Sequence, residues 1–161
     1  MSYEQKCRQL LASNDQKGFV DMLNEWIAKD GRKMQNLPFL AIKYYLERDY
    51  RACANTLRIT RDVKPEYMIY AVFSHIFLRE YDEAGKVLDN IIPHTEDEIM
   101  RKKLITLKHI VDSLSGKSEN VQIEDALRFI EMINEYEENV HIKESIKVLI
   151  DDIKKSLNIS Y

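Results

Sequence analysis

The chain has 161 residues, of which 45% are hydrophobic and 32% are charged. This length fits one compact domain with a core of its own. Only four Gly and three Pro are present, too few for the many turns of a β-rich fold, so long helices are expected. The formal net charge of -3 argues against general nucleic-acid binding, which needs a surplus of basic side chains on one surface.

The cysteines and the apolar segments bear on where the protein resides. Cys7 and Cys53 are far apart and form no C-x-x-C pair, so neither a disulfide framework nor a zinc site is indicated and a reducing compartment is expected. The N-terminus lacks the apolar core of a signal peptide. The most apolar run, 67–78, is shorter than the roughly 20 residues of a membrane span. We expect a soluble cytoplasmic protein, or a nuclear one in a eukaryote, with no membrane partner.

Apolar residues recur at helical spacing along nearly the whole chain, and helix breakers divide it into about nine segments. The first four helices are expected at 3–12, 13–28, 38–47 and 50–61. Ser13 and Gln16 form a capping pattern for the second helix. Pro38 is tolerated at the start of the third because its missing N–H would be unpaired there anyway. Asp49 is a suitable N-cap for the fourth.

The remaining helices are expected at 65–79, 82–92, 95–113, 123–137 and 141–157. The segment 65–79 is apolar in almost every direction, which indicates a helix surrounded by others. Thr95 and Glu98 supply a capping box for the seventh helix, and 116–120 is the most loop-like stretch. The last helix has one apolar stripe and a charged back, as the terminal cap of a helical solenoid requires.

A pattern of aromatic and small residues repeats through the first half of the chain. Phe19, Tyr50 and Tyr81 each lie near the start of an expected helix, at intervals of 31 residues. Small residues let neighbouring helices approach closely, so the pattern has a packing role. The positions three and seven residues after each aromatic are apolar or small: Met22 and Trp26, Cys53 and Leu57, Ala84 and Leu88.

The segments YYLERDYRACA (44–54) and FLREYDEAG (77–85) resemble the tetratricopeptide repeat (TPR), a helix-turn-helix unit of about 34 residues. Aligning the family's mid-repeat aromatic on Tyr50 places Tyr44 at its first-helix aromatic, Cys53 at its small residue and Pro65 at its closing proline. The resemblance implies a right-handed α-solenoid of about three TPR-like pairs that binds other proteins.

Three features depart from the family's pattern. The period is short, Leu37 occupies the early Trp position, and Ala41 replaces the usual first-helix Gly. The resemblance covers about 14–93, whereas 94–161 are helical without a repeat signature. We therefore expect a single domain, 1–161, in which the C-terminal part is an extension and cap.

Within this family, FLAIKYY (39–45) followed by DYRA (49–52) also looks like the N-terminal TPR region of scaffold subunits of the anaphase-promoting complex, a ubiquitin ligase of the cell cycle. This resemblance implies a homodimerising scaffold or adaptor in a multi-subunit assembly. One alternative is a small bacterial TPR chaperone that binds an apolar client segment. An all-helical enzyme or regulatory bundle with a buried polar site is the alternative from another class.

TPR arrays bind their partners mainly in a groove lined by the first helix of each pair. The resemblance places five apolar or aromatic side chains near such a ligand: Ile42, Tyr45, Ile69, Phe73 and Phe77. This surface suits an amphipathic helix or an extended apolar segment, although the competing interpretation makes most of these residues core. Pro38 and Ile42 stand where carboxylate-clamp members have Lys and Asn, so a chaperone-tail ligand is not expected.

A second candidate surface is the basic side of the helix at 50–61, formed by Arg48, Arg51, Arg58 and Arg61. It could pair with an acidic segment, such as the cluster of another subunit formed by Glu131, Glu135, Glu137 and Glu138. Exposed ion pairs contribute at most about 1 kcal/mol each, so they would orient an interface more than stabilise it. A solvated helix face is the competing interpretation.

Catalytic motifs are not evident in the sequence. The histidines, His75, His94, His109 and His141, are scattered, and His141-x-x-Glu144 reverses the Glu-x-x-His order of di-iron bundles. The sequence has no glycine-rich phosphate loop, no G-x-S-x-G and no H-E-x-x-H. Cys53 falls where the repeat needs a small buried residue, not a nucleophile. We expect no enzyme activity, cofactor or metal.

Overall fold

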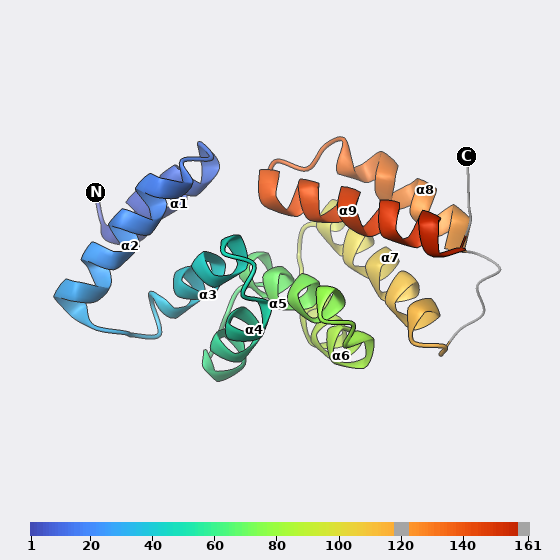
Figure 1. Cartoon of the computed structure of the whole chain (residues 1–161), viewed down its shortest axis with the longest axis horizontal. Coiled ribbons are helices and arrows are strands. Elements are labelled where there is room, and N and C mark those ends of the chain that lie inside the picture. Colours follow the sequence, from blue (N-terminus) through green and yellow to red (C-terminus); the bar gives the residue numbers. More distant parts are fainter. Residues whose placement is uncertain (118–122, 158–161) are drawn as a thin grey trace. The chain divides into compact units, whose positions relative to one another are not determined.

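The computed structural model describes residues 1–117 and 123–157, and within them it contains nine α-helices, one short 3-10 helix and no strand (Figure 1). The all-helical fold predicted from the sequence is confirmed. Most of the loop predicted at 116–120 lies outside the described residues. The chain divides into two compact units, Met1–Arg79 and Glu80–Tyr161, and the single domain expected at 1–161 stays a prediction.

Unit 1 contains five helices, and α3 lies at its centre. They are α1 (Tyr3–Ala12), α2 (Gln16–Asp30), α3 (Leu37–Leu46), α4 (Tyr50–Ile59) and α5 (Pro65–Phe77). The pairs α1/α2, α3/α4 and α4/α5 pack together, and α3 also contacts α2 and α5. Seven of the ten residues of α3 are buried, because three helices cover it.

A turn with nearly the same backbone geometry precedes α2, α4 and α6 (Tyr81–Ile91). In each case the preceding helix ends, one residue adopts the left-handed conformation, and the next residue is the N-cap. The left-handed residues Asn14, Arg48 and Arg79 have φ of 57°, 62° and 61°. The N-caps Asp15, Asp49 and Glu80 have ψ of 81°, 75° and 67°.

These turns correct the register of the predicted repeat. The residues four and eight positions after each N-cap are all buried: Phe19 and Leu23, Cys53 and Leu57, Ala84 and Leu88. Phe19 therefore corresponds to Cys53 and Ala84, not to Tyr50 and Tyr81. The N-caps lie 34 and 31 residues apart. Ser13 does not cap α2 but ends α1, because the Asp15 carboxylate accepts the Gly18 N–H at 2.9 Å.

A row of aromatic rings connects the two ends of unit 1. Tyr3 stacks on Trp26 at 5.9 Å between ring centroids, Trp26 contacts Phe39 at 5.9 Å, and Phe39 contacts Tyr67 at 5.4 Å. Such pairs contribute about 0.5–1.5 kcal/mol beyond the area that they bury. Because these residues come from α1, α2, α3 and α5 in turn, the row ties the first helix pair to the rest of the unit.

In unit 2 the turn occurs before α6, and no left-handed residue other than Gly116 is found in its described part. After α6 come η1 (Ile92–His94), α7 (Glu98–Leu114), α8 (Ile123–Asn134) and α9 (Val140–Leu157), each α-helix packing on the next. Asp97 caps α7 by accepting the Met100 N–H at 2.9 Å. Thr95, the expected cap, instead donates to the Ile91 carbonyl at 2.7 Å. The core is aliphatic and includes the fully buried Leu104, Leu107, Ile110, Leu127, Ile130 and Ile146.

Candidate functional site

The predicted groove residues are mostly core. Ile42, Tyr45, Ile69 and Phe73 are between 0% and 6% exposed, and only Phe77 is half-buried. The cause is the close packing around α3, which buries the side chains that a TPR groove would present. As a correction to the prediction, these four residues offer no surface to a ligand.

Three of the predicted groove residues, Tyr45, Phe73 and Phe77, belong to an aromatic cluster inside unit 1. Tyr45 contacts Tyr50 at 5.4 Å and Tyr70 at 5.1 Å between ring centroids, and Phe77 contacts Tyr50 at 5.2 Å and Phe73 at 6.1 Å. The rings come from α3, from the first residue of α4 and from α5. Their edge-to-face and tilted geometry is that of packed aromatic cores.

The predicted basic surface is exposed. Arg48, Arg51, Arg58 and Arg61 all lie on the surface of unit 1, and beside them Ile59 is 62% exposed. We call these four arginines and Ile59 the α4 surface. Unit 1 carries 13 Lys and Arg against 9 Asp and Glu, a formal charge of +4. An exposed apolar side chain among guanidinium groups can serve as an anchor for an acidic partner.

The acidic cluster of unit 2 is only partly available. Glu131, Glu135 and Glu138 are exposed, but Glu137 forms an ion pair with Lys103, which is 4% exposed. Glu137 therefore neutralises a buried charge inside the unit and is not free to meet a partner. Unit 2 carries 11 Lys and Arg against 18 Asp and Glu, a formal charge of -7.

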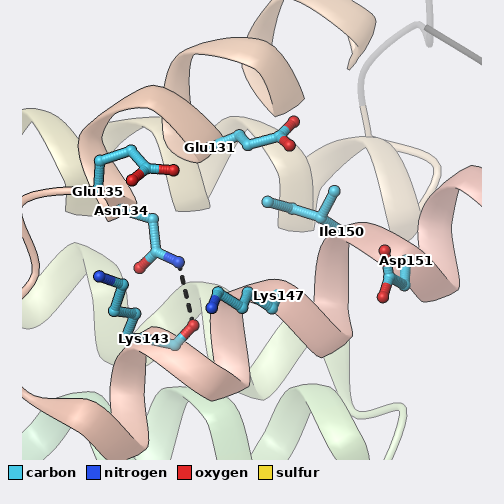
Figure 2. A pocket seen from close by; sticks show the side chains of 7 residues that line it. All are labelled: Glu131, Asn134, Glu135, Lys143, Lys147, Ile150 and Asp151. Atoms are coloured by element: carbon cyan, nitrogen blue, oxygen red, sulfur yellow. Dashed lines mark hydrogen bonds between the residues drawn. The ribbon is translucent and has the colours of Figure 1, made fainter.

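A polar cleft of about 310 Å³ lies between α8 and α9. Figure 2 shows one wall formed by side chains of α8 and the other by side chains of α9. The lining residues of α8 and the residue after it are Glu131, Asn134 and Glu135, and those of α9 are Lys143, Lys147, Ile150 and Asp151. Glu131 also lies 3.8 Å from the ammonium of Lys154.

Asn134 is the buried polar group of this cleft and is 4% exposed. Its amide nitrogen donates to the Lys143 carbonyl at 3.0 Å, the bond drawn in Figure 2. Its Oδ1 is buried and accepts no hydrogen bond from any described residue. Leaving such an acceptor without a donor costs about 1–3 kcal/mol. Sequence reasoning missed Asn134 because it lies inside the helix expected at 123–137 with no motif around it.

Burial shifts the pKa of three of the cysteines and histidines singled out in the sequence. Burial raises the pKa of the Cys53 thiol to about 12 and that of Cys7 to about 11, so both are protonated at neutral pH. The Cys53 thiol contacts the Tyr70 carbonyl at 3.9 Å, and burial lowers the pKa of His141. In the described part of the chain, no three His, Cys, Asp or Glu side chains are placed to hold a metal ion.

Comparisons with protein-family models, curated proteins and solved structures found no match to this chain. Within 1–117 and 123–157, no helix has both the length and the apolar character needed to cross a membrane.

Proposed function

We propose that the chain is a non-enzymatic protein-binding module of the tetratricopeptide type, a right-handed solenoid of helix pairs that acts as a scaffold or adaptor. The observation that carries the proposal is the turn repeated before α2, α4 and α6. Each copy has a left-handed residue, then an N-cap, then buried residues four and eight positions after the N-cap. Stacked repeats need such regularity because each unit packs only on its neighbours. The module needs no cofactor.

The partner-binding surface that we propose is the α4 surface, since the residues expected in a groove are buried. Its arginines attract an acidic segment, and the exposed Ile59 contacts an apolar side chain of that segment. A second copy of the chain is the first candidate, because unit 2 carries a formal charge of -7 and exposes Glu131, Glu135 and Glu138. Opposite charges orient such an encounter more than they tighten it.

This assignment agrees with a homodimerising scaffold of the kind that the anaphase-promoting complex contains. A bacterial chaperone for apolar clients is the alternative if the chain does not self-associate. The α8–α9 cleft favours a binding module over an enzyme. The carboxylates of Glu131 and Glu135 in this cleft are exposed, whereas carboxyl groups that catalyse acid–base reactions are usually buried or placed beside a close partner.

The test is the mass of the purified chain in solution across a dilution series, measured by light scattering after size exclusion. We expect a species of at least twice the 19.1 kDa chain that dissociates on dilution and more readily at high salt. The double variant Arg58→Glu/Arg61→Glu should be monomeric. Arg32→Glu/Lys33→Glu, which changes two exposed cations near the end of α2, should associate like the parent.

Two results would count against this proposal. A monomer at all concentrations would contradict self-association and would favour an adaptor or chaperone that binds a different protein. Equal loss of association in both double variants would show that total charge, and not the α4 surface, controls the assembly.

A further inference from the structure

We infer that the cleft between α8 and α9 binds a basic side chain of a protein partner, arginine above all. The inference concerns unit 2 alone and does not depend on the α4 surface or on self-association. It rests on three features: an unsatisfied buried acceptor in the cleft, the acidic charge of unit 2 and an apolar wall of the cleft.

The acceptor is Asn134 Oδ1, shown among the lining side chains in Figure 2. The amide cannot relieve it by rotating, because its nitrogen already donates to the Lys143 carbonyl at 3.0 Å. A ligand at this site must therefore supply an N–H or O–H donor. Lys143 and Lys147 border the amide, and their flexible four-carbon stems can move aside to admit one.

The charge of unit 2 favours a cationic donor. At the cleft itself the carboxylates of Glu131, Glu135 and Asp151 are balanced by the ammonium groups of Lys143 and Lys147 and by that of Lys154, 3.8 Å from Glu131. The surplus of acidic groups in unit 2 as a whole, a formal charge of -7, supplies the preference, because the summed field of a domain concentrates ligands of opposite charge. An anionic ligand would meet the acceptor oxygen of Asn134 and the carboxylates without a donor to offer them.

The shape of the cleft fits one side chain. Its volume of about 310 Å³ is at the small end of the range for ligand pockets. Ile150, which is 4% exposed, gives an apolar wall against which the aliphatic stem of Arg or Lys can pack while its charged head reaches the polar groups. Arginine fits better than lysine, because its planar fork can donate to Asn134 Oδ1 and to a carboxylate at once.

The experiment is an NMR titration of the full-length, ¹⁵N-labelled chain with acetyl-Gly-Arg-Gly-amide. We expect saturable shifts of the Asn134 side-chain amide, with a dissociation constant in the millimolar range. The matched ligand contains citrulline, which keeps the planar shape of arginine but is uncharged and has a carbonyl oxygen in place of one donating nitrogen, and it should bind several times more weakly. Absence of a saturable shift, or equal binding of the citrulline peptide, would overturn the inference.

Two variants test the location without disturbing the core. Glu135→Gln removes an exposed carboxylate that lines the cleft and should weaken arginine-peptide binding about two- to fivefold. Glu144→Gln removes an exposed carboxylate of α9 that does not line it and should leave binding unchanged. Equal weakening by both variants would place the peptide elsewhere on unit 2 and reject the cleft.

Discussion

Glu137→Met is expected to leave the ammonium of Lys103 without a counter-ion inside unit 2. The two side chains are 5% and 14% exposed, so neither charge is well solvated in the folded chain. Removing one partner of a buried pair costs about 3–5 kcal/mol, because the other charge stays buried. We expect about 3 kcal/mol, the low end of this range, since Glu137 lies closer to solvent and water can reach the site.

The reverse substitution and the double variant complete the cycle. Lys103→Met should cost about 2 kcal/mol, less than the first variant, because the carboxylate of Glu137 is the better exposed of the two groups. Lys103→Met/Glu137→Met replaces both charges with flexible apolar side chains and should come within about 1 kcal/mol of the parent. Such a pattern separates the cost of an unpaired charge from the value of the pair.

The assay is urea unfolding followed by the far-UV signal of the helices, with all four chains compared at one pH and salt concentration. Losses below about 1 kcal/mol in both single variants would show that the pair behaves like a surface salt bridge. A double variant that loses the sum of the two single losses would show that the side chains act independently. Either result would refute the reasoning.

Three further predictions follow from the turns and the buried groups. Arg48→Gly should stabilise the chain by about 0.5–1 kcal/mol in the same urea assay, because Arg48 has φ of 62°, which Gly adopts without a steric cost; Arg51→Gly, inside α4, should destabilise it by about 1 kcal/mol. Burial raises the pKa of Cys53 from 9.0 to about 12, so the folded thiol keeps its proton longer than the unfolded one. The contribution of the Cys53 thiol to the free energy of unfolding is therefore complete below pH 9 and is lost as pH rises toward 12. Cys53→Ala should flatten that decline. A thiol reagent should not label Cys53 in the folded chain at pH 8. Burial lowers the pKa of His141 from 6.5, so its contribution to the free energy of unfolding is present above pH 6.5 and is lost on acidification. Between pH 7 and pH 5 the free energy of unfolding should therefore fall less in His141→Gln than in the parent.

Helix positions could be predicted wherever a cap or a proline marked them. Asp49 does cap α4, accepting the Ala52 N–H at 3.1 Å, and Pro65 begins α5. The cap of α2 could not be predicted because Ser13, Asn14 and Asp15 can all accept a hydrogen bond. The left-handed conformation of Asn14 decides among them, and nothing in the local sequence required it at that position.

The candidate sites depended on contacts between helices, which the sequence pattern does not reveal. Ile42 and Phe73 have the residue types of either a groove or a core, and only the helices packed around α3 and α5 make them core. Asn134 had no motif around it. Its importance comes from the Lys143 carbonyl of the next helix, which holds the amide nitrogen and leaves the oxygen without a donor.

The corrected register changes what the repeat consists of. At the first buried position after each N-cap, Phe19, Cys53 and Ala84 differ greatly in volume, yet all are 0% exposed. Close packing requires the partner helix to compensate, and α1, which packs on α2, contributes only the small Cys7 as a buried residue. A large side chain on one helix thus accompanies a small one on the other. The repeat is one of backbone geometry more than of residue type, so the aromatic spacing of 31 is correct for Tyr50 and Tyr81, which each follow their N-cap directly, but places Phe19 three residues out of register.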